Sequence, residues 1–139
     1  MKPILCFVDN DEVYLFLMRK MIEKKYKDSK MLEFYNGLEA IEFIKENIHD
    51  TPLLPDIIFL DINMPVMDGW EFIESFTRIK HKITKPITIY MVSSSVDDAD
   101  IERAKNIQEI SDFRCKPMTI EKVNQIFGVT EYISQMTRS

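Results

Sequence analysis

Cysteine and histidine are scarce in this chain, which contains two of each. Cys6 and Cys115 lie inside apolar segments, without the CxxC spacing or the neighbouring histidine of a zinc site. We therefore expect both to be small core residues that stay reduced. The nine methionines, Met64 and Met67 among them, are expected to fill gaps in the core, because no histidine or cysteine cluster points to copper.

Long hydrophobic runs and an excess of positive charge are also missing. The apolar segment at residues 4–8 is too short for a secretory signal, and acidic and amide residues follow it at once. No later segment approaches the roughly 20 apolar residues that span a bilayer. The formal net charge of −5 disfavours direct binding to a nucleic-acid backbone. We therefore expect a cytoplasmic protein that binds neither membranes nor nucleic acid.

The composition that is present belongs to a folded globular protein. The chain has 139 residues, of which 45% are hydrophobic and 29% are charged, which suits one ordinary domain. No linker, internal repeat, low-complexity stretch or output domain is evident. We predict one domain over residues 1–128, followed at residues 129–139 by a tail or a helical extension.

Strand and helix patterns alternate along the whole chain. Short, nearly continuous apolar runs are typical of strands covered on both faces, and they occupy residues 4–8, 57–60 and 87–92. Weaker strand candidates are residues 31–35 and 112–115. Helical spacing occupies residues 13–24, 38–47, 70–80, 99–107 and 120–127. Five strands, each followed by a helix, predict an α/β domain with a doubly wound parallel sheet and helices on both faces.

Polar residues interrupt this pattern where the strands end. Asp9, Asn10 and Asp11 follow the first strand, and Asp61 follows the third. Because the carboxyl ends of parallel strands share one edge, these side chains should lie close together. The oxygens of Asp9, Asn10 and Asp61 suit Mg²⁺, and an aspartate beside that cation can attack phosphorus as a nucleophile.

Ser93 and Lys116 end the fourth and fifth strands at the same predicted edge. The Ser93 hydroxyl could donate a hydrogen bond to a phosphoryl oxygen, although Ser94 or Ser95 could take that role instead. The Lys116 ammonium would bring a positive charge to the same oxygens. The sequence thus predicts a site that accepts a phosphoryl group on an aspartate and responds to its charge.

Four segments carry a resemblance to a known family: Val-Asp-Asn-Asp at 8–11, Leu-Asp-Ile-Asn-Met-Pro-Val-Met-Asp-Gly at 60–69, Met-Val-Ser-Ser at 91–94 and Lys-Pro at 116–117. In residue type, order and spacing they resemble the receiver domains of response regulators, the CheY-like family, over about residues 4–127. The resemblance implies a flavodoxin-like fold with strand order 2-1-3-4-5. It also implies Mg²⁺ dependence and phosphorylation of Asp61 by a sensor histidine kinase or a phosphotransfer protein.

The resemblance assigns roles to individual residues. It implies that Asp9 forms the acidic pocket, that the backbone carbonyl of Asn63 binds the metal, and that Phe113 is an aromatic switch residue. Ser93 would be the switch hydroxyl and Lys116 the phosphate partner. The family also implies a cis peptide at Lys116–Pro117, a structural role for Pro65, and signalling to a downstream protein through the fourth helix, fifth strand and fifth helix. From the residues alone, Gly69 is expected to relieve backbone strain ahead of a helix.

Asn10 departs from the family, which usually has a second acid there. An amide oxygen carries no net charge, so we expect Mg²⁺ affinity to fall by at least about 10- to 100-fold, unless Asp11 compensates. This departure motivates an alternative function, a binding module indifferent to phosphorylation. An aspartyl phosphatase of the haloacid-dehalogenase type is disfavoured, because Asn63 stands where such an enzyme has its second acid. A flavodoxin is disfavoured by the acidic first loop.

Overall fold

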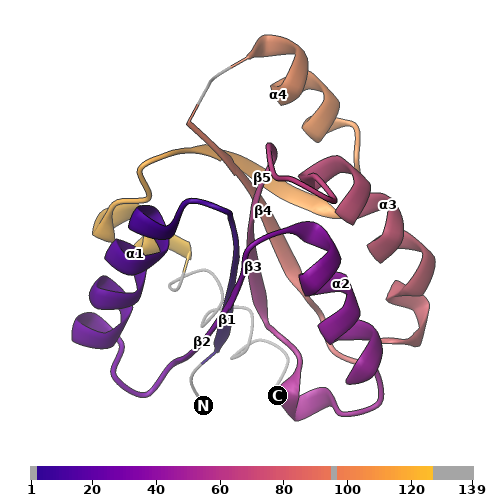
Figure 1. The fold of residues 1–139 in the computed structure, drawn as a ribbon, viewed down its shortest axis with the longest axis horizontal. Helices are drawn as coiled ribbons and strands as arrows, with labels where there is room; N and C mark the ends of the chain where they lie inside the picture. The colour runs from indigo at the N-terminus through magenta and orange to yellow at the C-terminus, as the bar shows by residue number, and fades with distance from the viewer. Residues whose placement is uncertain (1–2, 95–96, 127–139) are drawn as a thin grey trace.

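A computed structural model describes residues 3–94 and 97–126 of the chain. Its centre is a five-stranded parallel sheet with strand order β2-β1-β3-β4-β5 (Figure 1). The strands are β1 (Ile4–Val8), β2 (Lys30–Phe34), β3 (Ile57–Asp61), β4 (Thr88–Ser93) and β5 (Ile110–Cys115). The predicted doubly wound sheet and the strand order 2-1-3-4-5 are therefore confirmed.

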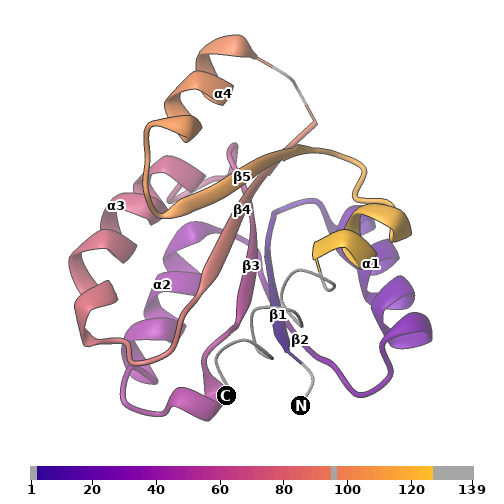
Figure 2. The ribbon, with the colours of Figure 1, turned by 180° about the vertical axis from the view of Figure 1, so that it is seen from behind.

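Helices cover both faces of the sheet, as predicted. The structure contains α1 (Glu12–Lys25), α2 (Gly37–Glu46), α3 (Gly69–Ile79) and α4 (Asp98–Lys105), and residues 120–126 are also helical. Helices α2, α3 and α4 lie on one face, and α1 lies with residues 120–126 on the other (Figures 1 and 2). None of the helices within the described ranges is long and apolar enough to cross a membrane. The tail predicted at residues 129–139 lies outside those ranges.

The helices begin where acidic and hydroxyl side chains can bind their free backbone N–H groups. Asp11 Oδ1 accepts hydrogen bonds from two N–H groups at the start of α1, and Asp97 accepts one from Ala99 at the start of α4. Asp68 and Glu71 form a reciprocal capping box at the start of α3. Such caps are worth about 1 kcal/mol each. They fix α1 and α3 directly beside the strand ends that carry Asp9 and Asp61.

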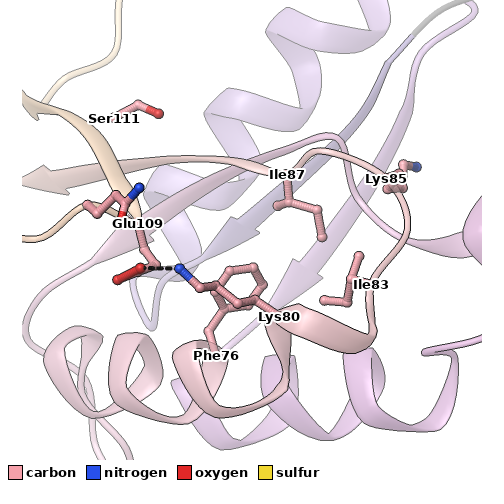
Figure 3. A pocket seen from close by; sticks show the side chains of 8 residues that line it. Phe76, Lys80, Ile83, Lys85, Ile87, Glu109 and Ser111 are labelled. Carbon is pink, nitrogen blue, oxygen red and sulfur yellow. Dashed lines mark hydrogen bonds and ion pairs between the residues drawn. The ribbon is translucent and has the colours of Figure 1, made fainter.

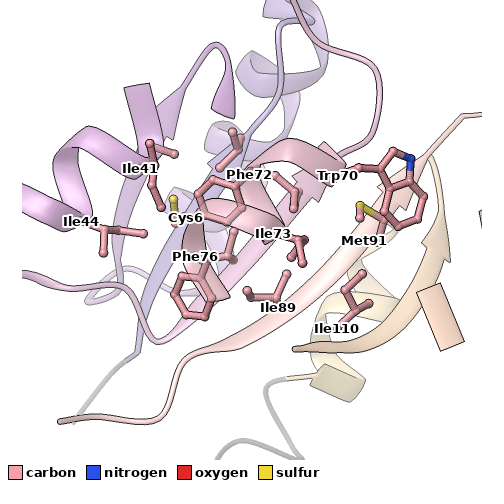
Figure 4. Packing of buried hydrophobic residues seen from close by; sticks show 14 of the residues in the cluster. Cys6, Ile41, Ile44, Trp70, Phe72, Ile73, Phe76, Ile89, Met91 and Ile110 are labelled. Atoms are coloured by element: carbon pink, nitrogen blue, oxygen red, sulfur yellow. The ribbon is translucent and has the colours of Figure 1, made fainter. Parts of the chain in front are cut away.

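The core consists of two apolar layers separated by the sheet. On one face, residues of β1, β3 and β4 pack against α2 and α3. Cys6 of β1 and Met91 of β4 lie in this layer with Phe72 and Phe76 of α3 (Figure 4). The other face packs against α1 and the helix at residues 120–126. Every residue of β3 is buried. Because β3 is the middle strand of the sheet, its last residue, Asp61, lies at the middle of the sheet edge.

Two short 3₁₀ turns were not predicted. They are η1 (Thr51–Leu53), which precedes β3, and η2 (Lys80–Lys82), which follows α3.

Cys6 is buried and Cys115 half-buried, and both are free thiols. The Lys116–Pro117 peptide is cis, as the family resemblance implies.

Candidate functional site

Three polar or charged side chains are buried in the described part of the chain, and all three lie at one edge of the sheet. Asp9 follows β1, Asp61 is the last residue of β3, and Ser93 is the last residue of β4. Their exposed fractions are 2%, 8% and 2%. Lys116 follows β5 at the same edge, with 13% of its side chain exposed. Segments about 100 residues apart in the sequence thus meet where a doubly wound fold binds its ligands.

The Lys116 ammonium joins the two buried carboxylates. Its Nζ lies 2.5 Å from Asp9 Oδ2 and 3.7 Å from Asp61 Oδ2. The Lys116 backbone N–H donates to the Ser93 carbonyl at 2.9 Å, which fixes the lysine against the end of β4. The ammonium is therefore in contact with both carboxylates, and the lysine backbone is bonded to the serine that ends the neighbouring strand.

Backbone groups hold the other oxygen of each carboxylate. Asp9 Oδ1 accepts a hydrogen bond from the Asp11 N–H at 2.9 Å, and Asp61 Oδ1 accepts one from the Ile62 N–H at 2.9 Å. Both acids are therefore oriented on one side by the main chain and on the other by Lys116. Side chains fixed in this way lose little further freedom when a ligand binds.

Burial raises the pKa of Asp61 to about 6, and the negative charge of Asp9 adds to the increase. The Lys116 ammonium and the Ile62 N–H oppose it, because both favour the ionised carboxylate. Asp61 is therefore mostly ionised at pH 7, yet it is more basic than an ordinary aspartate. A raised pKa on a fixed carboxylate in a recessed position is typical of a reactive group.

Tyr14 also belongs to this site, although the sequence did not reveal it. Lys116 Nζ lies 4.6 Å from the centroid of the Tyr14 ring. The tyrosine is 9% exposed, and its hydroxyl is buried without a hydrogen-bond partner among the described residues. Helical spacing alone would assign Tyr14 to the buried face of α1. The contact with Lys116 depends on the tertiary fold and leaves no local signal in the sequence.

The loop after β3 approaches Asp61 closely at Gly69. A Cβ atom on Gly69 would lie 2.4 Å from the Asp61 carbonyl oxygen, and the Gly69 N–H donates to the Ile62 carbonyl at 2.8 Å. The expectation that Gly69 relieves backbone strain was wrong, because no described glycine has a positive φ. A glycine is needed here for close packing, whereas the left-handed conformation falls on Val66, with φ of 70°.

The remaining predicted residues lie around the edge of the site. Asn10 and Asn63 are exposed, directly after Asp9 and two residues after Asp61. Phe113 is half-buried and packs against the core on the side of α3 and α4. Of the serine alternatives, Ser94 is exposed and Ser95 lies outside the described residues. The two structural prolines, Pro65 and Pro117, are exposed.

Asp11 has a structural position at this edge, since its Oδ1 accepts the N–H groups of Val13 and Tyr14 at 3.1 Å each. The oxygens that fit a cation are therefore those of Asp9 and Asp61, whose two negative charges face one ammonium. Among the described residues, no three or more His, Cys, Asp or Glu side chains form a metal-binding group. A pair of carboxylates suits Mg²⁺, which completes its octahedron with water and phosphate oxygens.

A pocket lies at the end of the sheet opposite to this site, before β4 and β5 (Figure 3). Its charged groups are already paired. Lys80 Nζ lies 2.6 Å from Glu109 Oε2, and Lys85 Nζ donates to the Leu54 carbonyl at 2.6 Å and contacts Asp56 at 3.2 Å. The charged groups of this pocket therefore form structural ion pairs, and the candidate reactive side chains lie at the carboxyl edge of the sheet.

The fold and the carboxyl edge together define a doubly wound α/β domain with a buried acid pair controlled by one lysine. The chain belongs to the family of response regulator receiver domains, whose model matches residues 5–127. Among solved structures it is similar to a two-component response regulator from Cytophaga hutchinsonii. That likeness has a TM-score of 0.81 at 26% identity and covers 92% of this chain and 96% of the other.

Curated relatives agree with this assignment. The chain is 30% identical, over 115 residues, to a protein-glutamate methylesterase/protein-glutamine glutaminase from Methanococcoides burtonii. The match covers 79% of this chain but only 30% of that relative's length. The chain is also 37% identical over 73 residues to chemotaxis protein CheY of Halobacterium salinarum, which covers 52% of each protein.

Proposed function

We propose that Asp61 accepts a phosphoryl group from a histidine kinase or a phosphotransfer protein, and that this modification controls contacts with a downstream protein. The observation that carries the proposal is the Lys116 ammonium, held between the Asp9 and Asp61 carboxylates at 2.5 and 3.7 Å. Such a cation, next to a buried and unusually basic aspartate, suits the transfer of a group that arrives with negative charge.

The transfer would form one bond and break one. A carboxylate oxygen of Asp61 attacks the phosphorus of a phosphorylated imidazole, the O–P bond forms and the N–P bond breaks. The phosphorylated imidazole carries a proton on its other ring nitrogen, so when the electron pair of the broken bond stays on the first nitrogen, a neutral histidine leaves. Lys116 donates to the transferred oxygens, and the Ser93 hydroxyl can donate to them as well. The product is an acyl phosphate on Asp61.

Receiver domains generally bind Mg²⁺, and the donor set of this site fits that ion. Asp9 and Asp61 would supply carboxylate oxygens, with the Asn10 amide and the Asn63 backbone carbonyl as the further candidates. When bound, Mg²⁺ neutralises the charge that develops on the phosphoryl oxygens. The chain's own contribution is to hold the two carboxylates in place and to keep Lys116 directed at them.

The signal would arise from the competition for Lys116. A phosphoryl group brings about 1.5 to 2 negative charges, so its oxygens compete with Asp9 for the ammonium. The Lys116 N–H binds the Ser93 carbonyl, and we propose that a shift of the lysine passes through this contact to β4. The surface of α4, β5 and residues 120–126 is therefore the proposed contact for a downstream protein.

A small-molecule phosphodonor with Mg²⁺ tests the proposal. The wild-type protein should gain one phosphoryl group by intact mass, and Asp61→Asn should gain none. Asp11→Asn is the matched control, because it removes a carboxylate from the same edge while asparagine still caps α1. This control should be modified like the wild type. An unmodified wild type at every Mg²⁺ concentration would contradict the proposal.

A binding module indifferent to phosphorylation is the second candidate, and exposed Asn10 is the observation that favours it. In that case a partner would bind equally well with and without phosphodonor, and equally well to Asp61→Asn. Partner binding that tightens on phosphorylation and is lost in Asp61→Asn would exclude it.

A further inference from the structure

Tyr14 presents an aromatic face to the one positive charge of the phosphoacceptor site. The Lys116 Nζ lies 4.6 Å from the ring centroid, within the range of a cation–π contact. The lysine side chain is only 13% exposed, so its ammonium has lost most of the water that would otherwise hydrate it. The carboxylates of Asp9 and Asp61 replace part of this hydration, and the ring lies close enough to replace more.

The position of the ring is fixed by its surroundings. The Tyr14 N–H donates to Asp11 Oδ1 at 3.1 Å, within the cap that starts α1. The tyrosine is 9% exposed and packs in the apolar layer between α1 and the sheet. The ring is therefore held from the backbone side by the helix cap and from the side-chain side by the core.

We infer that the Tyr14 ring is a positioning group for Lys116, which keeps the ammonium directed at Asp61 and so sets the affinity of the site for a phosphoryl group. This inference rests on the proposed phosphoacceptor function. Without the aromatic face, the ammonium would keep its ion pairs with Asp9 and Asp61 but would be less restricted around them, and each phosphoryl group bound would have to order it further.

The hydroxyl of Tyr14 has no part in this role. It is buried, and no residue in the described ranges forms a hydrogen bond with it. Burial, followed by the negative charges of Asp9 and Asp61, raises the pKa of Tyr14 well above its ordinary value. The tyrosine is therefore neutral, and Lys116 meets an uncharged aromatic face. Phenylalanine should serve as well as tyrosine, whereas an aliphatic side chain of similar burial should not.

Tyr14→Phe and Tyr14→Leu separate positioning from simple core packing. Trifluoroberyllate, a phosphoryl analogue, is titrated with Mg²⁺ into both variants and the wild type. Tyr14→Leu should bind it about 5- to 30-fold more weakly, the equivalent of losing a desolvated cation–π contact of about 1 to 2 kcal/mol. Tyr14→Phe should stay within about twofold of the wild type, because its ring keeps the contact.

The proton shifts of the Lys116 ε-methylene group provide a readout that core packing alone would not move. A ring above the ammonium should shift these resonances upfield in the wild type and in Tyr14→Phe, and this shift should be absent in Tyr14→Leu. If Tyr14→Leu does not fold, Tyr14→Met, whose flexible side chain fills irregular space, takes its place.

Three results would overturn the inference: wild-type affinity in the aliphatic variant, an equal loss in Tyr14→Phe, or no upfield shift in the wild type. Failure of the phosphoacceptor function looks different, because the wild type would then bind no trifluoroberyllate and gain no phosphoryl group. The ring-current shift would still report whether Tyr14 holds Lys116.

Discussion

Asn10 lies at the exposed edge of the acid pocket, next to Asp9, where receiver domains usually have a second acid. Its amide can lend an oxygen to a cation but no charge. One oxygen of the Asp11 carboxylate accepts two backbone N–H groups at the start of α1. The buried side chains of the site provide two negative charges, those of Asp9 and Asp61, against the one positive charge of Lys116.

Asn10→Asp should consequently tighten Mg²⁺ binding. The added carboxylate raises the electrostatic attraction at the edge of the pocket, and we expect the dissociation constant to fall about 10-fold or more. Calorimetric titration with Mg²⁺ measures this directly. Asn10→Ser, which offers a neutral oxygen, is the control and should bind no more tightly than the wild type. Equal affinities in the aspartate and serine variants would show that Asn10 does not face the cation.

Val66 is the one described residue other than glycine with a positive φ, 70°. The Met67 N–H donates to the Pro65 carbonyl at 2.7 Å, which closes a tight γ-turn around it. The valine side chain is 74% exposed, so it gains little from burial. A β-branched residue in the left-handed region is strained, and this strain lies in the loop that follows β3.

Val66→Asn should therefore stabilise the protein by about 1 kcal/mol, because asparagine adopts a positive φ at a lower cost than a β-branched residue does. Urea unfolding gives the change in the free energy of unfolding. Val66→Thr keeps the β-branch and the strain while adding polarity, so it should leave stability unchanged. A gain of the same size in both variants would trace the effect to surface polarity instead.

At the scale of elements, α4 is the helix with the weakest hold on the core. Ala104 is its one buried residue. A further contact comes from Arg103, whose guanidinium carbon lies 4.3 Å from the centroid of the Trp70 ring at the start of α3. A helix with so few buried contacts can shift at low free-energy cost. This property suits the element that follows Ser93 and lies on the proposed partner surface.

Arg103→Met should loosen α4, since it keeps an apolar stem over Trp70 but removes the charge that the ring attracts. We expect a loss of about 0.5 to 1 kcal/mol, together with faster acrylamide quenching of the fluorescence of Trp70, the only tryptophan in the chain. Arg78→Met, on the exposed side of α3, is the control and should leave quenching unchanged. Unaltered quenching in Arg103→Met would mean that other contacts hold α4.

The elements show which signals were readable in the sequence. Strands β1 and β3 were predicted almost to the residue, because burial on both faces leaves an uninterrupted apolar run. β5 begins at Ile110, two residues earlier than expected, since Ser111 and Asp112 are exposed at the sheet edge and look like loop residues. The 3₁₀ turns η1 and η2 were missed because three-residue elements have no periodicity to detect.

At the scale of the whole molecule, the topology converts four local signals into one site. The strand order brings Asp9, Asp61, Ser93 and Lys116 to one edge, and this could be predicted because each residue ends a recognisable strand. The contact between Tyr14 and Lys116 could not, because it depends on how far α1 leans over the sheet edge. The close approach of Gly69 to Asp61 was hidden for the same reason: it depends on the path of a loop.

The negative charge of Asp61 destabilises the folded protein. Its pKa is about 6 in the folded protein and about 3.9 in an unfolded chain, so the folded state binds the proton more tightly. The destabilising contribution of Asp61 is therefore absent below about pH 4, grows as the pH rises from about 4 to 6, and stays constant above that range. This direction is the reverse of that for a carboxylate whose pKa is lowered by a salt bridge.

Asp61→Asn, which keeps the shape and removes the charge, should thus be more stable than the wild type at pH 8 without Mg²⁺. A shift of this size corresponds to on the order of 2 to 3 kcal/mol, and it already includes the attraction to Lys116, which opposes the shift. The gain should shrink toward zero near pH 4, where both proteins are uncharged at residue 61. Urea unfolding from pH 4 to 8 measures it. Asp97→Asn, which keeps the cap of α4, is the control and should show no such trend. If Asp61→Asn were less stable than the wild type at pH 8, the ion pair with Lys116 would outweigh the effect of burial.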